Sequence, residues 1–128
     1  MSDIPEGVKM AVDTRDEQRC FRCREWIAAG GSRHHRKLRS RQGANTVQNL
    51  VLLCGSGTTR CHGWVHANVA EATRVGLIVP SWREPENVPI LRGELFLGGA
   101  YAEWFLLEPT AQLRPLTAPE AANLMEVM

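Results

Sequence analysis

Residues 20–66 read CFRCREWIAAGGSRHHRKLRSRQGANTVQNLVLLCGSGTTRCHGWVH, and this stretch contains all four cysteines and all four histidines of a chain of 128 residues. Neither residue type occurs before or after it. Cysteine and histidine are side chains that bind transition metals with well-defined spacings. Their confinement to one stretch therefore indicates metal sites rather than scattered core positions.

The cysteines form two pairs, Cys20-x2-Cys23 and Cys54-x6-Cys61. Two such pairs can supply four thiolates to one tetrahedral zinc ion, whose binding energy of about 10 kcal/mol or more is also folding energy. A disulfide pair or unrelated buried cysteines are the alternatives, and the second spacing is longer than usual. The N-terminus lacks the apolar core of a signal peptide, so we expect a cytoplasmic protein with reduced thiols. The cysteines thus predict structural Zn²⁺.

The histidines follow a second pattern, His34-His35 and His62-x3-His66. On a helix, His62 and His66 project from one face about one turn apart, so their imidazoles can bind one divalent metal. His34 can add a third ligand and leave positions open for water and a phosphate oxygen, as in a catalytic site. His35 points to the other side of a strand, where it is suited to act as a general base. Structural histidines are the alternative.

The charge distribution is uneven although the formal net charge is only +1. Residues 1–66 carry eleven Lys and Arg against six Asp and Glu, whereas residues 67–128 carry four against eight. No acidic residue occurs between Trp26 and Ala70. Such a basic surface is expected of a protein that contacts DNA phosphates, and a solvated arginine-rich loop is the alternative. The candidate DNA-backbone contacts are Arg33, Arg36, Lys37, Arg39, Arg41 and Arg60.

The middle of the chain is expected to form a strand, a loop, a strand and a helix. Residues 34–37 should form a short strand that enters a polar, basic loop. Residues 49–54 are an apolar run rich in strand-forming residues. Val65, Val69 and Ala72 then recur at helical spacing within residues 61–75. Gly76 follows where a helix C-terminal cap belongs.

The flanking regions give weaker signals. The first dozen residues look irregular, and Asp13 is a plausible N-cap for a short helix over residues 13–19. Residues 94–97 and 104–107, joined through a Gly-Gly pair, are expected to form a hairpin. Thr117 and Glu120 have the spacing of a capping box, which predicts a short C-terminal helix.

The order of these residues resembles the HNH endonuclease family. The resemblance is carried by the segments SRHHRK and QNLVLLCGSGTTRCHGWVH, which are similar to the small HNH proteins of phages and prophages. It implies an α+β fold, a ββα-metal (His-Me) finger stapled by a four-cysteine zinc site. The core motif would cover about residues 18–80, and residues 81–128 would be a C-terminal extension with a short β-hairpin. We expect one nuclease domain over residues 1–128.

The resemblance also assigns roles. The three histidines of the proposed metal site would bind a catalytic divalent metal, which could be Mg²⁺, Mn²⁺, Ni²⁺ or Zn²⁺. His35 would be the general base that activates water. Asn49 would fix the loop and help to orient that base, and Asn45 is a competing candidate for this role. We favour Asn49 because it directly precedes the apolar strand that ends at Cys54.

The expected function is metal-dependent hydrolysis of DNA phosphodiester bonds, as a phage-derived nicking activity in a bacterial host cell. No apolar run approaches the roughly 20 residues that span a bilayer, so we expect no membrane partner. One alternative is a zinc-dependent DNA-binding module without catalysis. Another is an accessory subunit of a phage DNA-packaging complex, docked on terminase or portal proteins. Residues 77–108 could then be the docking surface with Trp82, Trp104 and Phe105 as anchors, unless these side chains pack in the core.

Overall fold

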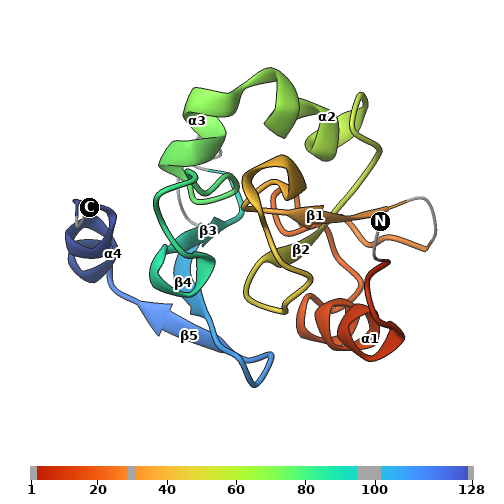
Figure 1. The fold of residues 1–128 in the computed structure, drawn as a ribbon, viewed down its shortest axis with the longest axis horizontal. Coiled ribbons are helices and arrows are strands. Elements are labelled where there is room, and N and C mark those ends of the chain that lie inside the picture. The colour runs from red at the N-terminus through yellow and green to blue at the C-terminus, as the bar shows by residue number, and fades with distance from the viewer. Residues whose placement is uncertain (1–2, 29–30, 95–101, 127–128) are drawn as a thin grey trace.

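The computed structural model describes residues 3–28, 31–94 and 102–126 and has an α+β fold, as the sequence predicts (Figure 1). Two 3₁₀ turns, Arg39–Arg41 and Pro85–Asn87, interrupt the loops. In chain order the helices and strands are α1 (Glu6–Arg15), β1 (Ser32–His35), β2 (Leu50–Leu53), α2 (Arg60–Ala67), α3 (Val69–Arg74), β3 (Ile90–Arg92), β4 (Glu103–Leu107), β5 (Leu113–Leu116) and α4 (Ala118–Glu126).

The strands form two small antiparallel sheets. In the first, β1 pairs with β2 so that His34 lies opposite Val51 and His35 opposite Leu50. In the second, β4 lies between β3 and β5. Figure 1 shows α2 and α3 along one side of the β1–β2 pair, α1 on the other side, and the second sheet with α4 at one end. The β1–β2 pair therefore lies between α1 and α2, the helix that carries His62 and His66.

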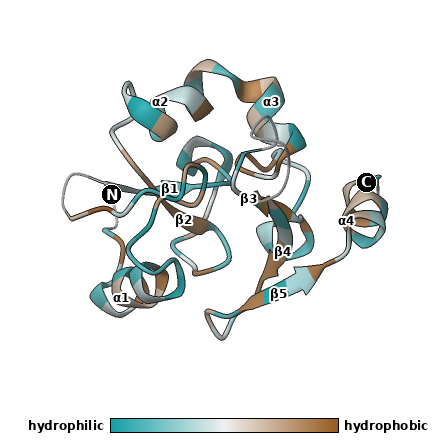
Figure 2. Cartoon of the chain, turned by 180° about the vertical axis from the view of Figure 1, so that it is seen from behind, coloured by the Kyte–Doolittle hydropathy of each residue, from teal (hydrophilic) through white to brown (hydrophobic). Residues whose placement is uncertain are grey.

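A continuous hydrophobic core connects the two sheets. Every residue of β2 is buried, because α1 packs on this strand and the knuckle residue Phe21 binds the main chain of Leu52. The same cluster includes Val65 of α2, Ile78 and Phe105 of β4. In Figure 2, β4 carries much of the apolar colour whereas α1 is largely hydrophilic. The helix that carries His62 and His66 is thus packed on a core that both sheets share.

The helix expected over residues 61–75 is broken into α2 and α3. Asn68 sits at the break with φ −133° and ψ 58°, and its side-chain amide donates to the carbonyl of Trp64 at 2.9 Å. An Asn side chain that binds nearby backbone competes with helical hydrogen bonds, which accounts for the interruption. Gly76 ends α3 at a positive φ of 79°, where a Cβ atom would lie 2.0 Å from the carbonyl oxygen of Pro89. The predicted glycine cap is confirmed.

The N-terminal prediction is wrong. Helix α1 begins after Pro5, and Asp13 lies inside the helix instead of capping it. Proline is well tolerated at a helix start because its missing N–H is not needed there. The carboxylate of Asp13 instead forms an ion pair with Arg33 of β1.

In the described part of the C-terminal region, β3 and β5 are strands that the sequence analysis did not predict. β4 includes the predicted residues 104–107, but its described partners are β3 and β5. Glu94 lies outside any strand, and residues 95–97 fall outside the described part of the chain. The capping box at the start of α4 is present, because Thr117 and Glu120 exchange hydrogen bonds between side chain and main chain at 2.8 and 3.2 Å.

Arg36 is completely buried and is a structural residue. Its guanidinium donates to four main-chain carbonyl oxygens that lie far apart in the sequence, at distances of 2.8–3.2 Å. These carbonyls belong to Gln48, Gly76, Pro85 and Val88. The earlier expectation that Arg36 contacts DNA is therefore wrong, since its side chain is 0% exposed.

Replacing Arg36 with methionine should destabilise the fold strongly. The substitution leaves several buried carbonyl groups without donors, and each unsatisfied group costs about 1–3 kcal/mol. We expect the free energy of unfolding, measured by urea denaturation of zinc-loaded protein, to fall by about 3 kcal/mol or more. Arg114→Met, at an exposed position of β5, is the control and should stay within about 0.5 kcal/mol of the wild type. Equal stability of the two variants would contradict the structural role.

Candidate metal centres

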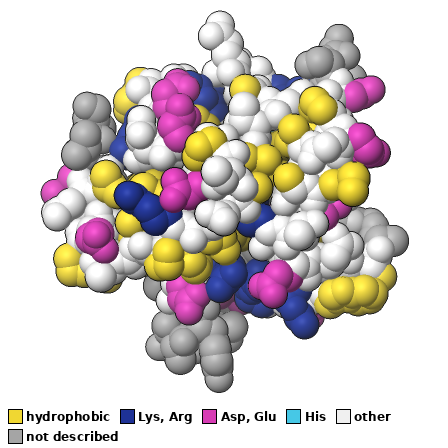
Figure 3. Space-filling view, turned by 90° about the horizontal axis from the view of Figure 1, so that it is seen from below, with side chains coloured by type: hydrophobic (Ala, Val, Ile, Leu, Met, Phe, Trp, Pro, Cys, Tyr) yellow, Lys and Arg dark blue, Asp and Glu magenta, His cyan; other side chains and the backbone are white. Residues whose placement is uncertain are grey.

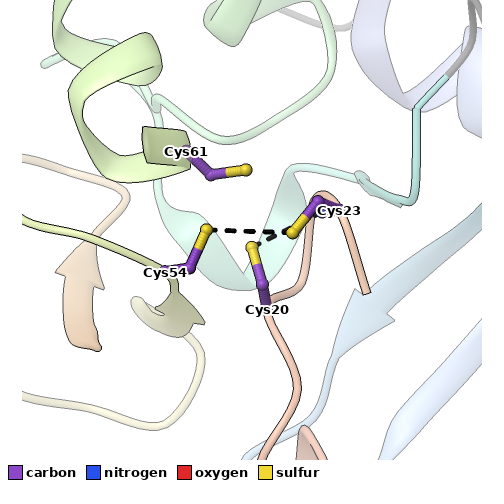
Figure 4. Close-up of side chains that lie close together, drawn as sticks. All are labelled: Cys20, Cys23, Cys54 and Cys61. Atoms are coloured by element: carbon purple, nitrogen blue, oxygen red, sulfur yellow. Dashed lines mark hydrogen bonds between the residues drawn. The ribbon is translucent and has the colours of Figure 1, made fainter. Parts of the chain in front are cut away.

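The four cysteines meet at one point although they come from three separate segments. Cys20 and Cys23 lie in the knuckle before β1, Cys54 directly follows β2, and Cys61 lies in the first turn of α2. All four are free thiols whose sulfur atoms lie within 4.8 Å of one another. Figure 4 shows the four side chains pointing toward a common centre. They form a group that could hold a metal ion.

The spacing of the sulfur atoms suits zinc. Tetrahedral zinc with bonds of about 2.3 Å places its sulfur ligands about 3.8 Å apart. The sulfurs of Cys23 and Cys54 are 3.8 Å apart (Figure 4). Donor type, number and separation therefore fit a closed structural site.

The thiols of the cluster influence one another's protonation. A hydrogen bond from Cys61 lowers the pKa of Cys20 to about 4 and raises the pKa of Cys61. Burial raises the pKa of Cys23 to about 12. A zinc ion binds cysteine as thiolate, so a divalent cation at this centre would favour the deprotonated sulfurs.

Three of the four histidines form a second cluster. His34 extends from β1 toward α2, where His62 and His66 lie one turn apart. The ring centroids are separated by 5.0 Å (His34–His62), 5.6 Å (His34–His66) and 4.9 Å (His62–His66). One nitrogen from each ring can be chosen so that all three lie within 4.8 Å of one another. His34 is buried whereas His66 is exposed, so the cluster opens to solvent on the side of His66.

The ring nitrogens of His34, His62 and His66 are placed so that they can bind a metal ion. The Nε2 atom of His34 lies 2.7 Å from the carbonyl oxygen of Leu77, which only accepts hydrogen bonds, so Nε2 carries the proton and Nδ1 is available. Burial lowers the pKa of His34 to about 3 and also lowers the pKa of His62. The Nε2 atoms of His62 and His66 are 3.1 Å apart, close to the roughly 3.3 Å edge of a tetrahedral zinc–nitrogen site. The donor set therefore fits one divalent metal.

His35 has a different environment from His34, and its partner is not the expected one. Its Nε2 atom lies 2.7 Å from Oδ1 of Asn45, whose amide nitrogen donates to the carbonyl of Asp3 at 3.3 Å. Asn45 therefore orients the ring of His35. The sequence offered only a weak signal for this, since Asn45 and Asn49 lie four residues apart and no local pattern specifies which of them reaches His35.

Asn49 fixes the loop between β1 and β2. Its side chain is fully buried and binds both the N–H and the carbonyl of Lys37, at 2.6 and 3.0 Å. A third hydrogen bond of 3.0 Å reaches the carbonyl of Ala44. This asparagine thus closes the loop on itself but does not contact His35 in the described hydrogen-bond network.

The basic residues are less available than the charge count suggested. Besides the buried Arg36, three of the six candidates are paired with acids from other segments, namely Arg33 with Asp13, Lys37 with Glu84 and Arg60 with Glu25. Lys37 is also largely buried. Arg39 and Arg41 lie on the 3₁₀ turn that follows β1, where Arg39 is exposed. Figure 3, which views the face opposite α2, shows mixed acidic and basic side chains and no histidine among the coloured ones.

The three aromatic candidates for docking fall into different environments. Phe105 belongs to the core, Trp104 is partly buried on β4, and Trp82 is 68% exposed. Phe105 is therefore unavailable as an anchor for a partner, because it packs in the interior.

Comparison of the chain with protein-family models, with curated proteins and with solved structures found no match. Within the described residues, none of the helices has the length and apolar character needed to cross a membrane. The chemistry assigned to the chain therefore depends on the two donor clusters themselves.

The two centres should be separable by mutation. We expect wild-type protein to bind one zinc ion tightly at the cysteines and a second divalent metal more weakly at the histidines. His62→Ala should abolish the weaker site and leave one zinc per chain, because Cys61 and the other sulfur ligands are unchanged. Elemental analysis combined with Ni²⁺ titration calorimetry measures both. A variant that binds Ni²⁺ as tightly as wild type would show that the histidines do not form the second site.

Proposed function

We propose that the chain is a metal-dependent DNA endonuclease of the HNH type, in which β1, β2 and α2 form a ββα-metal finger stapled by zinc at the four cysteines. The observation that carries the proposal is the convergence of His34, His62 and His66 on one side of β1, with His35 next in the chain and oriented by Asn45. Three imidazole ligands with an open side are typical of a catalytic metal site rather than a structural one.

His35 is the proposed general base. Because its Nε2 atom faces an amide oxygen, the proton resides on Nε2 and Nδ1 can accept a proton from water. The water oxygen then forms a bond to phosphorus while the bond from phosphorus to the 3′-oxygen breaks. The products are a 5′-phosphate and a 3′-hydroxyl, the latter protonated from solvent.

The three-histidine cluster supplies the electrostatic part of the mechanism. A divalent ion bound there would stabilise negative charge on the phosphate and on the leaving oxygen. The hydrogen bond to the carbonyl of Leu77 fixes the ring of His34, as is common for histidines that bind metals. Asn49 keeps the loop closed so that Asn45 stays beside His35. The chain's own residues thus position the base and the ligands relative to each other.

The proposed contacts of Arg39 and Arg41 with DNA are made to its phosphate backbone. Arg39 and Arg41 lie between β1 and Asn45, on the loop that carries the partner of the base. Contacts of this kind position a duplex without reading its sequence, so weak sequence preference is expected. One active site per chain nicks one strand, and double-strand breaks would require two chains or two events.

Supercoiled plasmid provides the test of this proposal. We expect wild-type protein to convert it to the nicked form in the presence of Mg²⁺, Mn²⁺, Ni²⁺ or Zn²⁺. His35→Ala should lower the cleavage rate by about 10²–10⁴-fold, the usual contribution of a general base. Zinc content and DNA binding of the variant should not change, because His35 belongs to neither metal cluster.

Thr46→Ala, at an exposed position of the same loop, is the matched control and should cut like the wild type. If neither protein cuts with any metal although both bind DNA, the chain is a DNA-binding module or requires a partner. Equal cutting by wild type and His35→Ala would show that another residue is the base.

A further inference from the structure

Arg22 lies inside the Cys20–Cys23 knuckle and contacts the four-cysteine centre from the side of α2. Its Nη1 atom donates to the sulfur of Cys61 at 3.4 Å. Its guanidinium also stacks on the ring of Trp64, 3.8 Å from the centroid. Cys61 and Trp64 both belong to α2, so one side chain joins the knuckle to the helix that carries the histidine ligands.

The same nitrogen forms an ion pair with Glu94, 2.9 Å away. The Arg22 and Glu94 side chains are only 15% and 13% exposed. Partly buried charges are weakly screened by solvent and salt, so both act strongly on groups beside them. The positive charge of Arg22 therefore acts on the sulfur of Cys61, and the negative charge of Glu94 partly offsets it.

These charges matter because four thiolates around one divalent metal leave two negative charges in excess. Hydrogen bonds and charges in the surroundings of metal ligands commonly change metal affinity by about 10–100-fold. Arg60 is a second cation beside the centre, since its interaction with Cys54 raises the pKa of Arg60, but its side chain is 60% exposed and paired with Glu25, so solvent screens its charge. Arg22 is the less exposed of these two cations, so its charge acts more strongly on the neighbouring sulfur.

We propose that Arg22 is a positioning residue of the four-cysteine centre, which offsets thiolate charge at Cys61 and fixes α2 through Trp64, and that Glu94 moderates this effect. The inference does not depend on DNA cleavage. It requires only that the cysteines bind a tetrahedral divalent metal. His62 directly follows Cys61 on α2, so the same contact also holds the first turn of the helix, which carries His62.

Opposite effects of two neutralising substitutions test the proposal. The full-length protein is titrated with Co²⁺, whose sulfur-to-metal charge-transfer absorption reports on the cysteine site alone. Arg22→Met should weaken binding about 10-fold and move this band to longer wavelength, because loss of the hydrogen bond raises the energy of the sulfur electrons. Glu94→Gln should strengthen binding and move the band the other way, since Arg22 is then no longer neutralised. Arg22→Lys should recover part of the affinity.

Arg24→Met, directly after Cys23, is the matched control. It should leave the charge-transfer band at its wild-type wavelength. If Arg22 and Glu94 formed a merely structural ion pair, both substitutions would weaken binding and neither would move the band, and this result would overturn the proposal. Should Arg22→Met fail to fold, Glu94→Gln still decides, since weaker binding with an unshifted band contradicts the assigned roles. Identical behaviour of Arg22→Met and Arg24→Met would also overturn it.

Discussion

The meeting of four sulfur atoms at the junction of three chain segments is the constraint on which the rest of the structure depends. Cys54 marks the end of β2 and Cys61 the first turn of α2, while Cys20 and Cys23 approach from the segment before β1. Helix α2 has only eight residues, which is too short to be stable alone in water. Its direction is therefore set by its anchors, and with it the side of β1 on which the imidazoles meet.

Buried arginines connect chain segments that a larger hydrophobic core would otherwise hold together. Arg36, directly after β1, binds carbonyl groups of three later segments, at Gln48, at Gly76 and at the turn from Pro85 to Val88. Arg15 at the end of α1 binds the carbonyls of Val47 and Leu50. A loop-rich chain leaves many carbonyls without partners in regular structure, and the planar guanidinium can satisfy several of them. Because arginines can bind buried carbonyl groups in this way, an arginine-rich stretch does not by itself indicate a DNA-binding surface.

The sequence allowed the two candidate metal-binding clusters to be predicted better than their surroundings. Ligand type and spacing are local properties, so the cysteine group and the strand, loop, strand and helix order could be recognised. Which asparagine contacts His35 depends on the path of the loop, which no local pattern specifies. Burial of Arg36 and the pairing of Arg33 with Asp13 depend on long-range packing, which a charge count does not register. Helix α1 was missed because its apolar residues are too sparse to give a clear period.

We propose that the two donor clusters bind metals of different chemistry, one site closed by sulfur and the other open and lined by nitrogen. X-ray absorption at the zinc and nickel edges of protein loaded with one equivalent of each metal tests it directly. The zinc edge should show four sulfur neighbours at about 2.3 Å, and the nickel edge only nitrogen and oxygen neighbours. Sulfur around nickel, fewer than four sulfurs around zinc, or failure to retain nickel would contradict the account.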